Sequence, residues 1–423
     1  MGRGKVFYGW YVVAACFLLC MLFAGSGFYS FSIFIQPVES EFGWSRGAVS
    51  LTMSIYLIVG GLMGPVVGRL IGRFGPKRVM YVCAAGAGAC FILVSQTFSL
   101  WYFYLLYALL AAMICGIGVV PVSNLMANWF VRRRGTATGI ALVGISAGGL
   151  VMAPLVGMIT VHFGWKASFI VIGMAVWLFA IPIVHFIIKD SPAKMGLLPD
   201  GDEQGENAPP AAQPNTAAAA PDHQAAEVIR TRAFWFIVTA FFLTACAQMG
   251  ILQHMVPMLM DIKGTTQTTA AAALGLTAGI GGVGKLVFGR LSDSWPFRYV
   301  VLLCFGLQAL AVLMLLHVDA AGMMWVYTVV FGFSMGGVIV LIPLAVGRYW
   351  GLMSFGVLLG ALWLANSLGG ALGTYVNGLS YDFIGNYRFI LYFFVAAYIF
   401  SIICFFLAGR KEFNRRSRQK PAI

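Results

Sequence analysis

Long apolar runs with few charges recur along the whole chain, and they limit the folds open to it more than any other feature. A helix of about 20 apolar residues crosses the hydrocarbon core of a bilayer. Sixty per cent of the 423 residues are apolar, 10% are charged and the mean hydropathy is +0.88, which is far from the composition of soluble domains. We therefore predict an all-α integral membrane protein with twelve spans. These spans lie near residues 8–37, 47–71, 77–96, 100–129, 135–160, 167–188, 233–260, 268–290, 297–317, 322–348, 353–378 and 387–409.

The basic residues predict how these spans are oriented. Of the 27 lysines and arginines, 22 fall in alternate connections and the two ends of the chain, and Lys285 lies inside a span. The four on the opposite side are Arg46, Lys166, Lys263 and Arg388. Because basic residues gather on the cytoplasmic side, we expect a multi-pass protein of the plasma or inner membrane with cytoplasmic N- and C-termini. The basic clusters are short and separated, so no nucleic-acid partner is expected beside the lipid bilayer.

Several classes of protein are disfavoured by what the apolar runs contain. All eight cysteines lie in these runs with no Cys-x-x-Cys pair, so we expect no disulfide, metal or cofactor. The runs hold no HExxH, no GxSxG with partners and no paired acids, which argues against an enzyme. The first apolar run is too long for a signal-peptide core and should remain as a span. A sensor that has lost transport would usually carry an added output domain, and the tail after Gly409 is short.

One connection, residues 190–232, is much longer than the others. It is rich in Ala, Pro and acidic residues and has no apolar periodicity, so it is predicted to be a mobile tether between two halves. The predicted domains are a six-helix half at 1–189, a cytoplasmic linker at 190–232, a second six-helix half at 233–409 and a basic cytoplasmic tail at 410–423.

An internal repeat supports this division. At a constant offset of 221 residues, Gly68-Arg69-Leu70 matches Gly289-Arg290-Leu291, Trp129 matches Trp350, and Gly148-Gly149 matches Gly369-Gly370. A duplicated fold places like residues at a fixed offset. The two halves should therefore have parallel topology and be related by an axis along the membrane normal.

The connection between spans two and three carries a recognisable motif. Gly68-Arg69-Leu70-Ile71-Gly72-Arg73-Phe74-Gly75-Pro76-Lys77-Arg78 resembles the G-x-L-a-D-R-x-G-x-K motif of the major facilitator superfamily, with Gly72 in place of its aspartate. Asp293 stands at the equivalent place in the second half. The resemblance implies a cytoplasmic gate in which a charged side chain meets a helix end of opposite dipole, and by symmetry we expect Asp293 near Arg132–Arg134. A solvated loop aspartate is the alternative. The predicted gate residues are Arg69, Arg73, Arg132, Arg133, Arg134, Arg290 and Asp293.

A narrower resemblance rests on three further segments. Tyr8-Gly9-Trp10-Tyr11, Trp129-Phe130 with Arg132–Gly139, and Gly144–Gly149 are similar to signatures of the monocarboxylate transporter family and its bacterial relatives. This resemblance implies a proton-coupled symporter for lactate- or pyruvate-like acids, working by alternating access and related to oxalate:formate exchangers, with anion exchange as a partial mode.

Lys285 is the main candidate for binding substrate. In the related families a basic residue four positions before the glycine of the span-eight turn is thought to hold the substrate carboxylate, and Lys285 stands four before Gly289. An ammonium facing a water-filled cavity offers a carboxylate its partner, although lysine lacks the planar fork of arginine. The alternative is that the side chain snorkels to cytoplasmic water.

Three residues are candidates for proton coupling: His254, Asp261 and Lys285 itself. Histidine titrates near neutral pH, and a buried lysine can alternate between neutral and charged forms. His254 merely hydrogen-bonded among helices, and Asp261 merely marking the water boundary, are the alternatives.

Polar or aromatic groups in otherwise apolar helices complete the predicted substrate site beside Lys285 and His254. Packing or helix–helix hydrogen bonding is the alternative for each. They are Phe28, Tyr29, Asn124, Ser146, Trp363, Asn366 and Ser367.

The sequence thus predicts a transporter, functional as a monomer, that moves a small monocarboxylate anion with a proton. Export or exchange of another organic anion, such as a dicarboxylate or an aromatic acid, or of an amphipathic drug is the alternative function.

Overall fold

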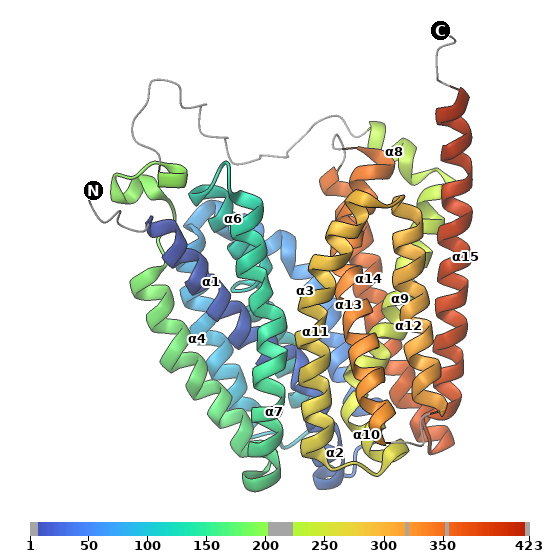
Figure 1. The fold of residues 1–423 in the computed structure, drawn as a ribbon. Helices are drawn as coiled ribbons and strands as arrows, with labels where there is room; N and C mark the ends of the chain where they lie inside the picture. The colour runs from blue at the N-terminus through green and yellow to red at the C-terminus, as the bar shows by residue number, and fades with distance from the viewer. Residues whose placement is uncertain (1–6, 202–222, 318–320, 352–354, 419–423) are drawn as a thin grey trace. The chain divides into compact units, whose positions relative to one another are not determined.

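The computed structural model describes residues 7–201, 223–317, 321–351 and 355–418. Helices make up the regular structure of these residues, with no strand among them (Figure 1). The α-helices are α1 (Tyr8–Phe23), α2 (Phe31–Phe42), α3 (Arg46–Phe74), α4 (Pro76–Val94), α5 (Leu100–Cys115), α6 (Val119–Trp129), α7 (Arg134–Ala175), α8 (His223–Ile229), α9 (Arg232–Gln253), α10 (Met255–Lys263), α11 (Gln267–Ser294), α12 (Phe297–His317), α13 (Ala321–Trp350), α14 (Phe355–Ile384) and α15 (Arg388–Arg418). The π-helical segments are η1 (Ala24–Tyr29), η2 (Val176–Ala180) and η3 (Ile183–Ile187), and the 3-10 segments are η4 (Pro192–Met195) and η5 (Pro199–Gly201).

Eleven helical stretches of the described residues are long and apolar enough to cross a membrane. One of them, Arg134–Ile187, has 54 residues, or about 80 Å at 1.5 Å per residue, against a hydrocarbon core of about 30 Å. It is interrupted at Gly164, whose φ of 84° lies outside the helical region. Divided there, the stretch supplies spans five and six. The all-helical fold and its twelve spans are therefore as predicted.

Three of the predicted spans consist of more than one helix. The first runs through α1, η1 and α2, the fourth through α5 and α6, and the seventh through α9 and α10. Such breaks leave backbone groups without their usual helical partners, so neighbouring side chains have to supply them.

The chain divides by its contacts into two compact units. Unit 1 comprises Met1–Trp44, Val59–Asn215 and Gln267–Gly275, and unit 2 comprises Ser45–Ile58, Thr216–Thr266 and Leu276–Ile423. Each unit contains a short piece of a helix whose remainder belongs to the other: α3 changes unit after Ile58, and α11 after Gly275.

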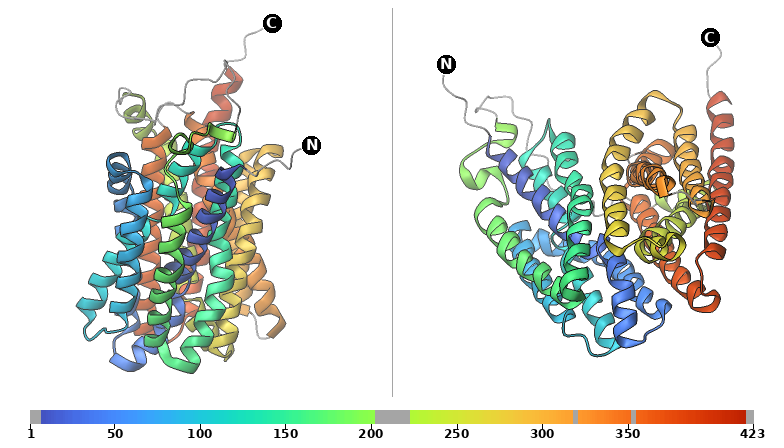
Figure 2. Two further views of the ribbon diagram at one scale, coloured as in Figure 1. Left: turned by 90° about the vertical axis from the view of Figure 1, so that its left-hand side faces the viewer. Right: turned by 60° about the horizontal axis from the view of Figure 1, so that its bottom comes forward.

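The repeat seen in the sequence is also a repeat of packing. In unit 1, a Cβ at Gly148 of α7 would overlap the carbonyl oxygen of Met21 on α1; in unit 2, a Cβ at Gly369 of α14 would overlap that of Phe242 on α9. Both the glycines and their partners are 221 residues apart. The helices α1 and α7, and α9 and α14, therefore touch backbone to backbone at equivalent points, and Figure 2 shows these helices from two further sides.

Backbone turns repeat at the same spacing. Gly43 and Gly264 have φ of 67° and 60°, and Gly164 and Gly385 have φ of 84° and 72°. Glycine reaches positive φ without steric cost. The same bends therefore follow α2 and α10, and precede the last span of each half.

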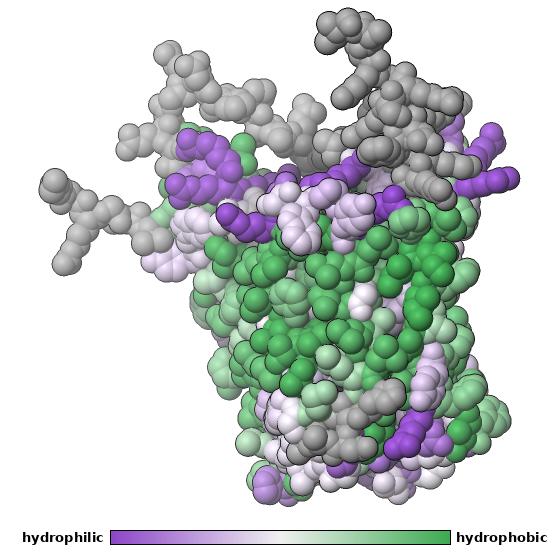
Figure 3. All heavy atoms as spheres, turned by 45° about the vertical axis from the view of Figure 1, so that its right-hand side comes forward, coloured by the Kyte–Doolittle hydropathy of each residue, from purple (hydrophilic) through white to green (hydrophobic). Residues whose placement is uncertain are grey.

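Side-chain polarity follows the expected span positions. On the face drawn in Figure 3, hydrophobic residues fill the middle of the helices and hydrophilic residues gather at both ends. Helix α15 continues as a helix to Arg418, beyond the predicted end of its span at 409. Most of the predicted linker, residues 202–222, lies outside the described residues.

Candidate functional site

Lys285 lies on α11, half-buried, within one of the membrane-spanning helices. Close packing fixes the position of this helix against α13. A Cβ at Gly284 would overlap the carbonyl oxygen of Phe333, and one at Gly336 would overlap that of Gly281. Small residues let membrane helices approach to backbone contact. Lys285 is thus carried by a helix whose depth and rotation are set by its immediate neighbours.

His254 occupies the break between α9 and α10 and is fully buried. Its Nδ1 lies 3.2 Å from the hydroxyl of Tyr387, and its Nε2 lies 3.0 Å from both the Ser50 hydroxyl and the Thr374 carbonyl oxygen. These partners come from α3, α14 and the segment before α15. The imidazole therefore joins three parts of unit 2.

The donors and acceptors around His254 assign its tautomer. Arg46 donates to the Tyr387 hydroxyl oxygen at 2.9 Å, and a guanidinium has no acceptor, so the hydroxyl hydrogen of Tyr387 points to Nδ1. The hydrogen of Nε2 then goes to the Thr374 carbonyl oxygen and the Ser50 oxygen, since Ser50 itself donates to the Arg46 carbonyl oxygen at 2.6 Å. This pattern is that of a neutral histidine.

Asp261 on α10 forms an ion pair with Arg46, the first residue of α3. The Arg46 Nη1 lies 3.0 Å from Asp261 Oδ2. Arg46 is only 7% exposed, whereas the side chain of Asp261 is 28% exposed. The carboxylate therefore remains within reach of water while its cationic partner does not.

A second carboxylate holds the backbone of Arg46. Asp382 at the end of α14 accepts the N–H groups of Arg46 and Gly47 at 2.8 and 2.7 Å. The first N–H groups of a helix have no partner inside it, and a negative charge there is favourable. The Arg46 guanidinium also lies over the Tyr381 ring, 3.6 Å from its centroid, a cation–π contact.

His254 and Asp261, both predicted for proton coupling, thus belong to one network through Tyr387 and Arg46. The sequence reading missed Arg46, Tyr387 and Asp382 as functional candidates. For Arg46 a signal was available, since it follows Ser45 directly at the start of an apolar run and is one of few basic residues on the presumed outer side.

Four predicted substrate residues lie in unit 1. Phe28 and Tyr29 end the π-helical segment η1, with their rings edge to face at 5.1 Å and Tyr29 buried. Asn124 on α6 accepts a hydrogen bond from Asn128 at 3.3 Å, and Ser146 on α7 is buried. A π-helical turn inside a helix is frequently found at functional sites, so η1 is the most informative of these positions.

Trp363, Asn366 and Ser367 lie half-buried on α14 in unit 2. Trp363 packs against a hydrophobic cluster that includes Leu358 and Leu362, so packing accounts for part of its surface. A polar role for Asn366 stays a prediction.

The start of α7, predicted as part of the gate, receives a carboxylate from within unit 1. Asp200 Oδ2 accepts the N–H groups of Val131 and Arg132, both at 2.8 Å, and Asp200 Oδ1 lies 3.4 Å from that of Arg133. Burial alone would raise the pKa of the Asp200 carboxyl, but hydrogen bonds from these backbone groups lower it below its ordinary value.

The start of α4, just beyond the motif, is held in a similar way. The Lys77 N–H donates to Asp190 Oδ1 at 2.8 Å, and Lys194 pairs with the same carboxylate. Two acidic residues after the sixth span therefore supply the negative charges at helix starts where the motif, with Gly72, has none.

The predicted gate arginines, Arg69, Arg73, Arg132–Arg134 and Arg290, are all exposed. Asp293 is 77% exposed and lies 3.4 Å from Arg348, a pair of little energetic weight at such exposure. The expected approach of Asp293 to Arg132–Arg134 joins residues of the two units and stays a prediction.

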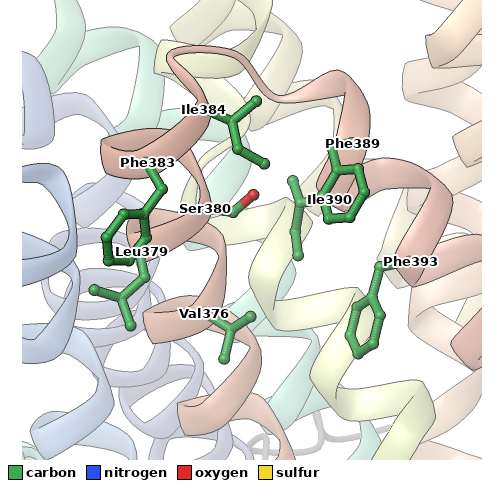
Figure 4. A pocket seen from close by; sticks show the side chains of 8 residues that line it. All are labelled: Val376, Leu379, Ser380, Phe383, Ile384, Phe389, Ile390 and Phe393. Carbon is green, nitrogen blue, oxygen red and sulfur yellow. The ribbon is translucent and has the colours of Figure 1, made fainter.

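An apolar groove of about 330 Å³ lies between the end of α14 and the start of α15 (Figure 4). Phe383 and Phe389 line it, and its single polar group is the hydroxyl of Ser380. Because it offers no cation, this groove does not fit a carboxylate.

Comparison with known proteins identifies the class of the chain. Residues 17–374 match the model of the Major Facilitator Superfamily. The chain belongs to this family, whose members are transporters.

Similar proteins are found among curated and solved ones. An uncharacterized MFS-type transporter, YcxA, of Bacillus subtilis (strain 168) is 27% identical over 86% of both chains. The oxalate:formate antiporter of Oxalobacter formigenes is 25% identical over 86% of this chain and 83% of its own. Monocarboxylate transporter 13 of Bos taurus is 25% identical over 90% and 84%. A crystal structure of a bacterial homolog of the lysosomal transporter Spinster covers 99% of this chain and 100% of its own at 18% identity, with a TM-score of 0.76.

Proposed function

We propose that this protein is a secondary active transporter of small monocarboxylates such as lactate or pyruvate, driven by co-transport of a proton. The observation that carries the proposal is Lys285, a cationic residue half-buried on a membrane-spanning helix, in a chain related to proteins named for monocarboxylate and oxalate:formate transport. An intramembrane cation is retained where a function uses it.

In this proposal the Lys285 ammonium binds the substrate carboxylate, and a single cation suits one carboxylate better than two. Phe28, Tyr29, Asn124, Ser146 and Asn366 are proposed to line the substrate path. The gate arginines would act at the cytoplasmic side, with both termini in the cytoplasm and the protein in the plasma or inner membrane as a monomer.

For the coupling step we favour Asp261 over His254 as the group that takes up the proton. A second proton on His254 would lie at Nδ1, facing the Tyr387 hydroxyl that already accepts from the Arg46 cation. Asp261 is the more accessible group, and its negative charge is the one that a proton would cancel. His254 then serves to position Tyr387.

The test is uptake of labelled lactate and pyruvate into proteoliposomes with and without an inward proton gradient. Wild type is compared with Lys285→Ala, Lys285→Arg and Arg388→Ala, the last being an exposed cation at the start of α15. We expect gradient-driven uptake in wild type and Arg388→Ala, loss in Lys285→Ala and partial activity with altered acid preference in Lys285→Arg.

Uptake by Lys285→Ala at the wild-type rate would remove the carboxylate-binding role from Lys285. Failure of the folded wild type to take up either acid would reject the monocarboxylate assignment and favour another organic anion or an amphipathic drug.

A further inference from the structure

The first part of α3, residues 45–58, is attached to unit 2 by a row of polar contacts. Arg46 binds Asp261, Tyr387 and Asp382; one turn later Ser50 meets His254; and a further turn on Ser54 donates to the Ala371 carbonyl oxygen at 2.7 Å. We call residues 45–58 the α3 start. Its fit against α14 is close, because a Cβ at Gly378 would lie 2.5 Å from the Ser50 hydroxyl.

Only one of these contacts depends directly on protonation of an accessible group. Asp261 has 28% of its side chain exposed, so a proton can reach it from water, whereas Arg46 is 7% exposed. When Asp261 is ionised, the two charges compensate each other. When it is protonated, the guanidinium stays buried without its ionic partner on α10, which is strongly unfavourable.

We propose that the Arg46–Asp261 ion pair is a proton-operated clasp, which holds the α3 start on unit 2 while Asp261 is ionised and releases it when Asp261 is protonated. Tyr387 and Asp382 are positioning residues in this clasp: the first orients the guanidinium, and the second anchors the backbone of Arg46. The inference concerns the conformational step, so it rests on proton coupling in the proposed function but not on the identity of the acid.

The surroundings of the pair agree with this assignment. The other titratable or charged groups near it are His254 at the α9–α10 break, Tyr381 and Asp382 on α14, Tyr387 before α15, and Lys263 two residues along α10. Asp382 already uses both oxygens on backbone N–H groups. Asp261 is therefore the carboxylate whose charge answers that of the Arg46 side chain.

Release is physically plausible for a transporter because α3 continues beyond Ile58 as part of unit 1. Alternating access needs helix contacts that break and re-form as the two repeats rock. A contact held by one accessible carboxylate couples that motion to the proton without a further titrating group.

The experiment measures the accessibility of a thiol placed by Ser54→Cys in the full-length protein in nanodiscs. Ser54 is 3% exposed and touches α14, but not the ion pair. Alkylation at position 54 is read by peptide mass spectrometry, which keeps the eight native cysteines apart. Each rate is divided by that of the same protein carrying Asp261→Asn at the same pH, which cancels the ionisation of the thiol itself.

We expect alkylation about tenfold slower than with Asp261→Asn at about pH 7, with the ratio approaching one as the pH falls towards the ordinary pKa of a carboxyl group. Glu41→Gln is the matched control, since it neutralises the carboxylate of another ion pair, with Lys166 in unit 1. It should leave the ratio unchanged.

A second substitution separates release of the clasp from misfolding. Arg46→Met added to Asp261→Asn removes the uncompensated cation, so alkylation should become slow again; a misfolded protein would not recover. A single Asp261→Asn that is alkylated at the wild-type rate, or a double variant as fast as the single, would overturn the proposal. Since the readout needs no substrate, failure of lactate uptake would leave this result standing and reject only the proposed substrate.

Discussion

The carboxylate of Asp382 accepts the backbone N–H of Arg46 at 2.8 Å, although 336 positions of sequence separate the two residues. The same carboxylate accepts the next N–H, of Gly47, and the Ser45 hydroxyl accepts that of Ala48 at 3.2 Å. Three of the unpartnered N–H groups at the start of α3 are therefore satisfied, two of them by a residue of α14.

Asp382→Ala is expected to destabilise the protein by about 1–2 kcal/mol, because two buried N–H groups lose their acceptor. Asp382→Asn keeps one carbonyl oxygen and should fall between the alanine variant and wild type. Thermal unfolding in detergent measures the effect, with the exposed Asp293→Ala as control, expected within about 0.5 kcal/mol of wild type. Equal melting of Asp382→Ala and wild type would show that the contact adds nothing.

Gly284→Ala should disrupt the contact between α11 and α13, since its Cβ would overlap the backbone of Phe333. We expect a loss of at least about 1–3 kcal/mol, as for overpacked cores, and a lower yield of monodisperse protein. Gly289→Ala is the matched control five residues along α11, where the nearest atom would be Val340 Cγ1 at an ordinary 3.6 Å. If both variants melt like wild type, the helices do not approach as closely as described.

Gly164→Ala tests the break that divides Arg134–Ile187 into two spans. A side chain at φ of 84° is strained by about 1–2 kcal/mol, so the apparent melting temperature should fall. Gly139→Ala, in the helical part of α7 with no atom within 4 Å of a new Cβ, should be neutral or slightly stabilising. The opposite order of the two variants would mean that position 164 is helical and the stretch unbroken.

Asp200 predicts a pH dependence at the start of α7. Its pKa is lowered in the folded protein, so the contact stabilises the fold above the unfolded-state pKa of about 3.9 and loses that contribution as the pH falls through the lower folded-state value. Hydrogen exchange of residues 131–133 should be faster in Asp200→Asn than in wild type at about pH 6. The substitution keeps a residue tolerant of the positive φ of 59°, so it isolates the charge.

At a pH below the folded-state value, where Asp200 is protonated in both states, the two proteins should exchange alike. A difference that persists unchanged there would assign the effect to the side-chain amide rather than to the charge.

The fold could be predicted because it depends on long-range averages of the sequence. Twelve apolar runs and the offset of 221 residues are properties of the whole chain, and the packing of Gly148 on Met21 and of Gly369 on Phe242 repeats that offset atom by atom. Single helix breaks were not predictable from hydropathy, since the α9–α10 break at His254 depends on acceptors from three other segments.

The candidate residues were predictable only one at a time. His254 and Asp261 stand out as polar groups near or within apolar runs, but their connection passes through Arg46 and Tyr387, which lie more than a hundred residues away. The sequence places Arg46 in a connection and gives no sign that it is buried. Likewise the acceptors for α4 and α7 come from Asp190 and Asp200, in a segment whose composition reads as a tether.

These two carboxylates bear on how the protein is divided for work on its separate halves. A fragment ending at 189, where the sequence places the domain boundary, would lack the acceptors for the N–H groups of Lys77, Val131 and Arg132. A fragment ending just after residue 201 would keep both. The tether therefore begins about a dozen residues later than composition suggests, and co-expressed half-transporters should associate and fold better when split there.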